Sequence, residues 1–233
     1  NDRRNLRIGW NKVFRHGIPC LFFYIKKESV TFAIHWNYKE KFMNELMKED
    51  IRKACEVMQK GGVILYPTDT IWGIGCDATN AEAVKRVYEI KKRADSKAML
   101  VLVDNAVKVD FYVKEPPEVA FDLIECATKP MTIIYDDARN LASNLLAEDG
   151  SVGIRITSEP FTKALCEQLR HPVVSTSANL SGEQSAKTFQ DIVHELIDAV
   201  DYVCQYRRND TAIHQPSSII KIDEKERITM IRS

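Results

Sequence analysis

Three cationic side chains follow a predicted helix near the middle of the chain: Lys91, Arg93 and Lys97. Lys91 and Arg93 stand where that helix is expected to end, a position that favours cations, and Lys97 precedes the apolar run 99–103. Arginine offers a planar fork to phosphate oxygens and lysine a point charge. A solvated helix end is the commoner explanation for one such cation, but three at one junction suit a polyphosphate.

A second candidate is the hydroxyl-rich stretch STSANLSG, residues 175–182, which follows an apolar run. Its hydroxyls, its carboxamide and the N–H groups of a glycine-containing loop are typical of an anion- or nucleotide-binding loop. The same composition is also typical of a turn that caps the next helix. Composition does not decide between the two.

A third candidate is the loop that begins at Pro67 and extends to the predicted helix cap at Asn80; it contains Thr68, Gly73 and Gly75. The glycines permit close approach of the backbone to a ligand, and Thr68 is suited to orient a small polar substrate. Arg155 is a single cation within the apolar run VGIRI. We expect it either to pair with a core carboxylate or to face a ligand carboxylate. The chain has no GxxxxGK[ST], GxGxxG or GxSxG motif, which argues against a P-loop, a dinucleotide fold and a hydrolase elbow.

The elements that must position these residues are apolar strands and amphipathic helices in rough alternation. Helices are expected from Glu49 to a stop at Gly61, after Asn80, and at 116–127, 162–169 and 189–200. Strands are expected at 63–66, 99–103, 131–135, 151–156, 173–174, near Tyr202, and at 218–222 and 228–231. Because the last strands break the alternation, we predict an α/β fold with a twisted, open, mixed sheet and helices on its faces.

The first 42 residues differ from the rest in composition. They hold nine Lys/Arg, three Asp/Glu and nine of the twenty aromatic residues, although the net charge of the 233-residue chain is zero. Within them, residues 30–36 alternate weakly like a strand. We predict a basic, aromatic-rich extension over 1–42, not necessarily part of the natural protein, and one domain over 43–233, with Met43 as a plausible natural start.

The remaining composition points to a cytoplasmic protein without a membrane span. The six cysteines are scattered, with no CxxC pair and no zinc-site spacing, so we expect reduced thiols and no protein-held metal. The longest apolar run, 18–25, is too short to cross a bilayer.

Four motifs together resemble the YrdC/YciO domain family: YPTDTIWGIGCDA, Lys91-x-Arg93 with Lys97, SVGIRI and STSANLSG, in that order. The likeness covers about residues 49–232. It implies a twisted open sheet with a large concave face, and the activity of a short, single-domain threonylcarbamoyl-AMP synthase. Such enzymes condense L-threonine, bicarbonate and ATP into threonylcarbamoyl-AMP and pyrophosphate, with Mg2+ carried by ATP. Their product serves downstream transferase proteins that modify tRNA.

The resemblance also implies roles for individual residues. The catalytic tetrad matches Lys91, Arg93, Ser177 and Asn179. ATP is expected to contact the tetrad together with Lys97, Ser151, Ser185 and Ser217. The pocket for L-threonine matches Thr68, Arg155 and Ser175, with Arg155 the natural partner of the amino-acid carboxylate.

The motifs depart from the family pattern at several positions. Ala94 replaces a proline, Ala98 a proline or glycine, and Lys221 an aspartate. No tetrad member is lost. An alternative is therefore a divergent YciO-like paralogue that binds tRNA or double-stranded RNA without synthase activity.

Overall fold

The computed structural model describes residues 27–92, 99–223 and 226–233, and the side chains among these from residue 43 onward. The chain divides into two compact units, Asn1–Lys41 and Phe42–Ser233, and the second contains the sheet and both cavities described below. Helix α1 (Lys27–Gln59) begins in the first unit and ends in the second. The predicted strand at 30–36 is wrong. No glycine or proline interrupts residues 27–59, so nothing in the sequence ends a helix there.

Within the described residues, nine strands form one mixed sheet in the order β7-β1-β2-β6-β3-β5-β4-β8-β9. Three neighbouring pairs are parallel (β1·β7, β3·β5 and β4·β8), and the other five are antiparallel. The strands are β1 Ile64–Tyr66, β2 Gly73–Gly75, β3 Leu100–Val103, β4 Met131–Tyr135, β5 Val152–Ile156, β6 Val173–Ser177, β7 Tyr202–Val203, β8 Ser218–Ile222 and β9 Ile228–Arg232. The predicted fold class is confirmed.

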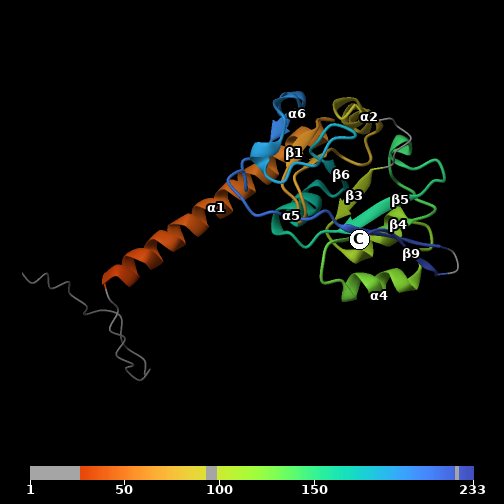
Figure 1. Ribbon diagram of the computed structural model, residues 1–233, viewed down its shortest axis with the longest axis horizontal. Coiled ribbons are helices and arrows are strands. Elements are labelled where there is room, and N and C mark those ends of the chain that lie inside the picture. Colours follow the sequence, from red (N-terminus) through yellow and green to blue (C-terminus); the bar gives the residue numbers. More distant parts are fainter. Residues whose placement is uncertain (1–26, 93–98, 224–225) are drawn as a thin grey trace, which may run out of the picture. The chain divides into compact units, whose positions relative to one another are not determined.

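Helices cover both faces of this sheet (Figure 1). The further α-helices are α2 Ala81–Ile90, α3 Val109–Tyr112, α4 Glu118–Cys126, α5 Pro160–Leu169 and α6 His194–Ala199, and short 3-10 turns are η1 Ala106–Lys108, η2 Ser143–Leu145 and η3 Phe189–Asp191. Side chains of α2 and α4 pack in one core cluster, and those of α1 and α5 in a second. Alternate residues of β1 and β3 enter alternate clusters, so the two clusters lie on opposite faces of the sheet.

Two local expectations need correction. Residues 67–79 were expected to form one loop after β1, but 73–75 form strand β2 between β1 and β6. A three-residue strand with two glycines has no periodicity to detect, and backbone pairing on both sides stabilises it. The helix expected over 189–200 is split into η3 and α6, because Ile192 and Val193 adopt extended backbone angles between them.

Candidate functional site

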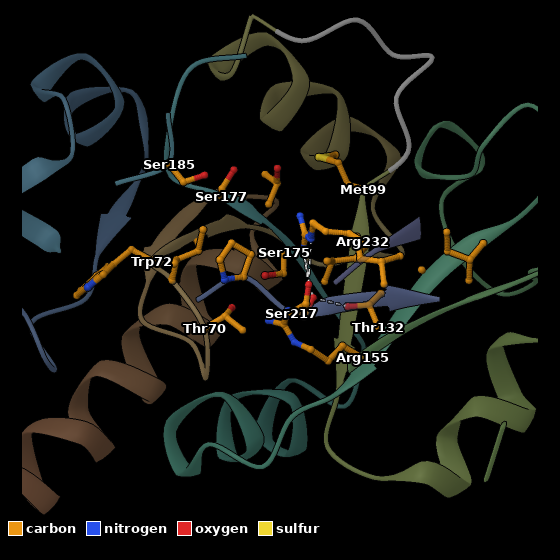
Figure 2. Close-up of a pocket in the computed structure, with 18 residues that line it drawn as sticks. Thr70, Trp72, Met99, Thr132, Arg155, Ser175, Ser177, Ser185, Ser217 and Arg232 are labelled. Carbon is orange, nitrogen blue, oxygen red and sulfur yellow. Dashed lines mark hydrogen bonds between the residues drawn. The ribbon is translucent and has the colours of Figure 1, made fainter. Parts of the chain in front are cut away.

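A cavity of about 240 Å³ opens on the sheet face that carries α1 and α5. We call it the first cavity. Its floor is formed by alternate residues of three strands, which include Leu100, Thr132, Ile134, Gly153 and Arg155. Its rim comes from segments far apart in sequence: the loop before β2, the end of β6, Ser185, the start of β8 with the two residues before it, and Arg232 at the end of β9 (Figure 2). The sheet therefore gathers polar side chains from four strands, β4, β5, β6 and β9, into one cavity.

Arg155 is the central cation of this cavity. Its side chain is 3% exposed, and its Nη2 lies 3.0 Å from Asp69 Oδ1 in an ion pair. Its Nε, by contrast, is buried without a hydrogen-bond partner. A buried donor without a partner carries a desolvation cost that a ligand acceptor would remove. Both alternatives of the sequence analysis are thus present in one side chain: Arg155 is paired with a core carboxylate and also borders a cavity.

Lys91 stabilises the hydroxyl-rich loop from outside the first cavity. It is the C-cap residue of α2 and is 2% exposed. Its Nζ donates hydrogen bonds to the carbonyl oxygens of Ser177 and, at 2.7 Å, of Asn179. The Lys91 carbonyl in turn accepts from Ser181 N–H at 2.9 Å. The contacts fix the turn after β6, which presents Ser177 to the first cavity. Lys91 itself is not among the residues that line it.

Asn179 and Ser185 form the outer part of the same loop. The Asn179 carboxamide donates to the carbonyls of Leu180 and Glu183, each at 2.8 Å, and accepts from the Ser185 hydroxyl at 3.5 Å. The turn is closed by these local hydrogen bonds, but it does not cap a helix, because the next helical element, η3, begins only at Phe189 and is capped by Thr188. Ser177 and Ser185 nevertheless face the cavity (Figure 2), as the ligand-loop interpretation requires.

Thr68 organises the loop before β2. Its hydroxyl donates to the Ile71 carbonyl at 2.7 Å and accepts from Thr70 N–H at 3.0 Å. Its own carbonyl accepts from Arg207 Nη1 at 3.0 Å. Thr68 is 2% exposed. It lies outside the set of residues lining the first cavity, whereas its neighbour Thr70 belongs to that set.

The opposite side of the cavity is built by Thr132, Ser217 and Arg232. The Thr132 and Ser217 hydroxyls lie 2.9 Å apart, and Arg232 donates to the Ser217 carbonyl from Nε at 3.0 Å and from Nη2 at 2.8 Å. Figure 2 shows Ser217 between the two guanidinium groups. Partial burial, and to a lesser degree the charge of Arg155, lower the pKa of Arg232. Two guanidinium groups at one cavity favour an anionic ligand.

The structure brings together five of the predicted site residues at the first cavity: Arg155, Ser175, Ser177, Ser185 and Ser217. Asn179 lies in the loop next to this group, and Lys91, at the end of α2, donates hydrogen bonds to that loop. Ser151 is buried and does not line the cavity; its N–H donates to Asp149 Oδ1 at 3.0 Å. Arg93 and Lys97 lie outside the described residues.

Sequence reasoning missed Arg232, Thr132 and Asp69. Arg232 stands in an apolar strand, ITMIR, as Arg155 does in VGIRI, so the argument used for Arg155 applies equally to it. Among the described residues, no group of three His, Cys, Asp or Glu side chains is suited to hold a metal ion, and no helix is long and apolar enough to span a membrane.

Comparison with known proteins supplies the family. Residues 56–233 match the Sua5/YciO/YrdC family, described as "Telomere recombination". The chain belongs to this family. Relatives named threonylcarbamoyl-AMP synthase include one from Pseudoalteromonas translucida, 32% identical over 65% of this chain and 83% of its own length. Another, from Pseudomonas aeruginosa, is 34% identical over 63% of this chain and 81% of its own.

Solved structures share the family fold. E. coli YciO has a TM-score of 0.68 and 26% identity, covering 78% of this chain and 88% of that one. P. abyssi Sua5 complexed with L-threonine has a TM-score of 0.70 at 21% identity, which shows the fold alone. The match covers 78% of this chain but only 53% of that protein, so this chain spans about half of its length.

Proposed function

We propose that this protein is a threonylcarbamoyl-AMP synthase, which joins L-threonine, bicarbonate and ATP into threonylcarbamoyl-AMP and pyrophosphate. The observation that carries the proposal is Arg155, a buried guanidinium with an unpartnered Nε at a cavity rich in hydroxyl groups. A guanidinium in this state suits the carboxylate of an amino acid. Two relatives that are more than 30% identical to this chain are named threonylcarbamoyl-AMP synthase, which supports the same reaction.

Residues take roles according to their place. Arg155 binds the threonine carboxylate and Ser175 contacts the same substrate, while Thr68 fixes the loop that closes this end of the cavity. Arg232, Ser177, Ser185 and Ser217 surround the ATP phosphates. Lys91 and Asn179 hold the loop that presents Ser177. Arg93 and Lys97 lie outside the described residues, and their proposed role at the ATP phosphates rests on the motif resemblance alone.

The chemistry then requires positioning and charge neutralisation. The threonine amine first combines with bicarbonate, releasing water and giving a carbamate. A carbamate oxygen attacks the α-phosphorus of ATP, and the bond to the β-phosphate oxygen breaks as pyrophosphate leaves. Among the described residues lining the first cavity there is no Asp, Glu, His or Lys, so in-line orientation and the two guanidinium charges supply the catalysis.

We further propose that Mg2+ arrives with ATP. The donors around the cavity are hydroxyls and guanidinium groups, and no cluster of carboxylates lies among the described residues. Mg2+ commonly keeps several water ligands and binds through substrate phosphates. This donor set fits a metal held by phosphate oxygens and water.

The test is pyrophosphate release from ATP, measured with and without L-threonine and bicarbonate. Release that requires both substrates supports the synthase. In the Arg155→Gln variant we expect the KM for L-threonine to rise by about tenfold or more, because a charged carboxylate pair is lost. Turnover that is independent of threonine, or an unchanged KM in the variant, would contradict the assignment. ATP-independent binding of tRNA without release would instead favour the RNA-binding paralogue.

A further inference from the structure

A second cavity of about 210 Å³ lies on the other face of the same strands. Strand alternation separates the two: Thr132 and Ile134 of β4 line the first cavity, whereas Ile133 and Tyr135 line the second. On β5, Arg155 and Ile154 divide in the same way. The end of α4 and the following segment 127–130 border the second cavity. It is therefore separate from the proposed substrate site.

The floor of the second cavity is aliphatic, and the buried polar group beside it is the carboxylate of Asp69. Ile133 and Ile154 are 1% and 2% exposed. Asp69 also lines this cavity, although its carboxylate pairs with Arg155 of the first. Asp69 thus lines the second cavity and pairs with a residue of the first, so it links the two.

The Asp69 carboxylate is incompletely satisfied. Its side chain is 7% exposed, and Oδ1 accepts no hydrogen bond of good geometry although Arg155 Nη2 lies 3.0 Å away. Burial raises the pKa of Asp69, and the Arg155 charge opposes this change. A second donor, particularly a cationic one, would satisfy the remaining lone pairs of the carboxylate. Lys129 borders the cavity too, but it is exposed, where water and salt weaken its field.

We propose that the second cavity binds a small aliphatic ammonium compound, whose charged nitrogen contacts Asp69 and whose hydrocarbon part covers the isoleucine floor. Such a ligand has a second effect. When a carboxylate binds Arg155 in the first cavity, part of the positive charge facing Asp69 is neutralised, and the ammonium ligand becomes the better partner for Asp69. Linkage is reciprocal, so the ammonium ligand strengthens carboxylate binding at Arg155 by the same factor. This second effect, for L-threonine, rests on the proposed function.

The isoleucines allow each cavity to be observed separately. Ile133 and Ile154 line the second cavity, and Ile134 and Ile219 line the first. The full chain, labelled with 13C at the isoleucine δ1 methyls, is titrated with isopentylammonium chloride. We expect saturable shifts at Ile133 and Ile154. 3-Methylbutanol, the uncharged analogue, should bind at least tenfold more weakly. Shifts confined to Ile134 and Ile219, no saturation, or equal binding of the alcohol would overturn the proposal.

Two variants separate the contributions of shape and charge. Ala127, exposed at the C-cap of α4, lines the second cavity, and Ala127→Phe should fill its mouth and abolish binding of the ammonium ion. Cys126→Ala, at the adjacent exposed position, is the control and should bind normally. Asp69→Asn should remove the preference for the ammonium over the alcohol. If Asp69→Asn does not fold, Ala127→Phe still decides, since retained binding there would overturn the site.

The coupling is tested by titrating L-threonine with and without the ammonium compound. We expect its affinity to rise about fivefold, the lower end of typical coupling between linked sites. If the ammonium ion binds and L-threonine shifts neither Ile134 nor Ile219, the proposed function fails and the second site stands. If only L-threonine binds, the second site fails and the proposed function stands. Binding of both without any change in affinity would overturn the coupling.

Discussion

The hydrogen bonds of Lys91 predict that replacing this residue destabilises the fold as well as the site. Lys91→Met keeps an unbranched apolar stem but removes the ammonium group, which donates to the Ser177 and Asn179 carbonyls. Hydrogen bonds from a charged donor contribute roughly 1.5–3 kcal/mol each. Methionine avoids the cost of burying a charge, which offsets part of that sum. We therefore expect the free energy of unfolding to fall by about 2–4 kcal/mol.

The neighbouring residue provides a matched control. Lys92 lies one position further along, and its Nζ pairs with Glu195 at 2.7 Å on a side chain that is 63% exposed. An exposed pair of this kind contributes less than about 1 kcal/mol. Urea unfolding followed by far-UV circular dichroism measures both variants. If Lys91→Met unfolds at the same urea concentration as Lys92→Met, these hydrogen bonds do not hold the loop and the reasoning is wrong.

Further predictions concern the sheet and the titration of one carboxylate. In Gly75→Ala, the new Cβ would lie 2.0 Å from the Val174 carbonyl oxygen, so we expect a loss of about 3 kcal/mol or more in urea unfolding; Gly73→Ala, whose Cβ would meet nothing closer than 3.4 Å, should unfold close to wild type. The hydrogen bond from the Ser151 hydroxyl is the main cause that lowers the pKa of Asp149 to about 2. Ser151→Ala should raise this pKa toward the ordinary value of about 3.9, as measured by the carboxyl 13C shift during an acid titration. A carboxyl group with a lowered pKa stabilises the fold at pH values above its unfolded-state pKa. This stabilisation is lost as the pH falls through about 2, so the difference in stability between wild type and variant should vanish near pH 2. Because Asp149 is 57% exposed, that difference should stay below about 1 kcal/mol, and an unchanged pKa would contradict the assigned cause.

Much of the fold was predictable because its strands are short apolar runs with clear ends. The strand predicted at 99–103 is β3, and the one predicted at 131–135 is β4. The helix cap at Asn80 was also predictable, and its side chain accepts a hydrogen bond from Ala83 N–H at 3.1 Å. Strand β2 was not predictable in this way, because it is held between β1 and β6, and β6 lies about 100 positions away in the sequence.

The site was less predictable, because the sequence indicates which residue types are present but not which of their atoms already have hydrogen-bond partners. Lys91 stays a predicted ATP contact, and the structure adds that its ammonium group donates to two carbonyls. Thr68 stays a predicted substrate contact, and the structure adds that its hydroxyl closes a loop. Both are polar groups whose hydrogen-bonding requirements are met by nearby backbone, and that competition is not visible in a one-dimensional pattern. Arg155 is the opposite case, since one of its donors remains unmet.

The first cavity draws on both early and late parts of the chain. Thr70 and Trp72 lie at one side, and Ser217 and Arg232 at the other. During synthesis, the ribosome adds about 160 residues from Trp72 to Arg232, at a rate of roughly 5–20 residues per second. The early strands are therefore synthesised before the residues on the other side of the cavity. Contacts between residues this far apart in sequence form slowly. A nascent chain released before Arg232 is added has the sheet's core strands but cannot complete the cavity. The first cavity is therefore complete only after Arg232 has been added.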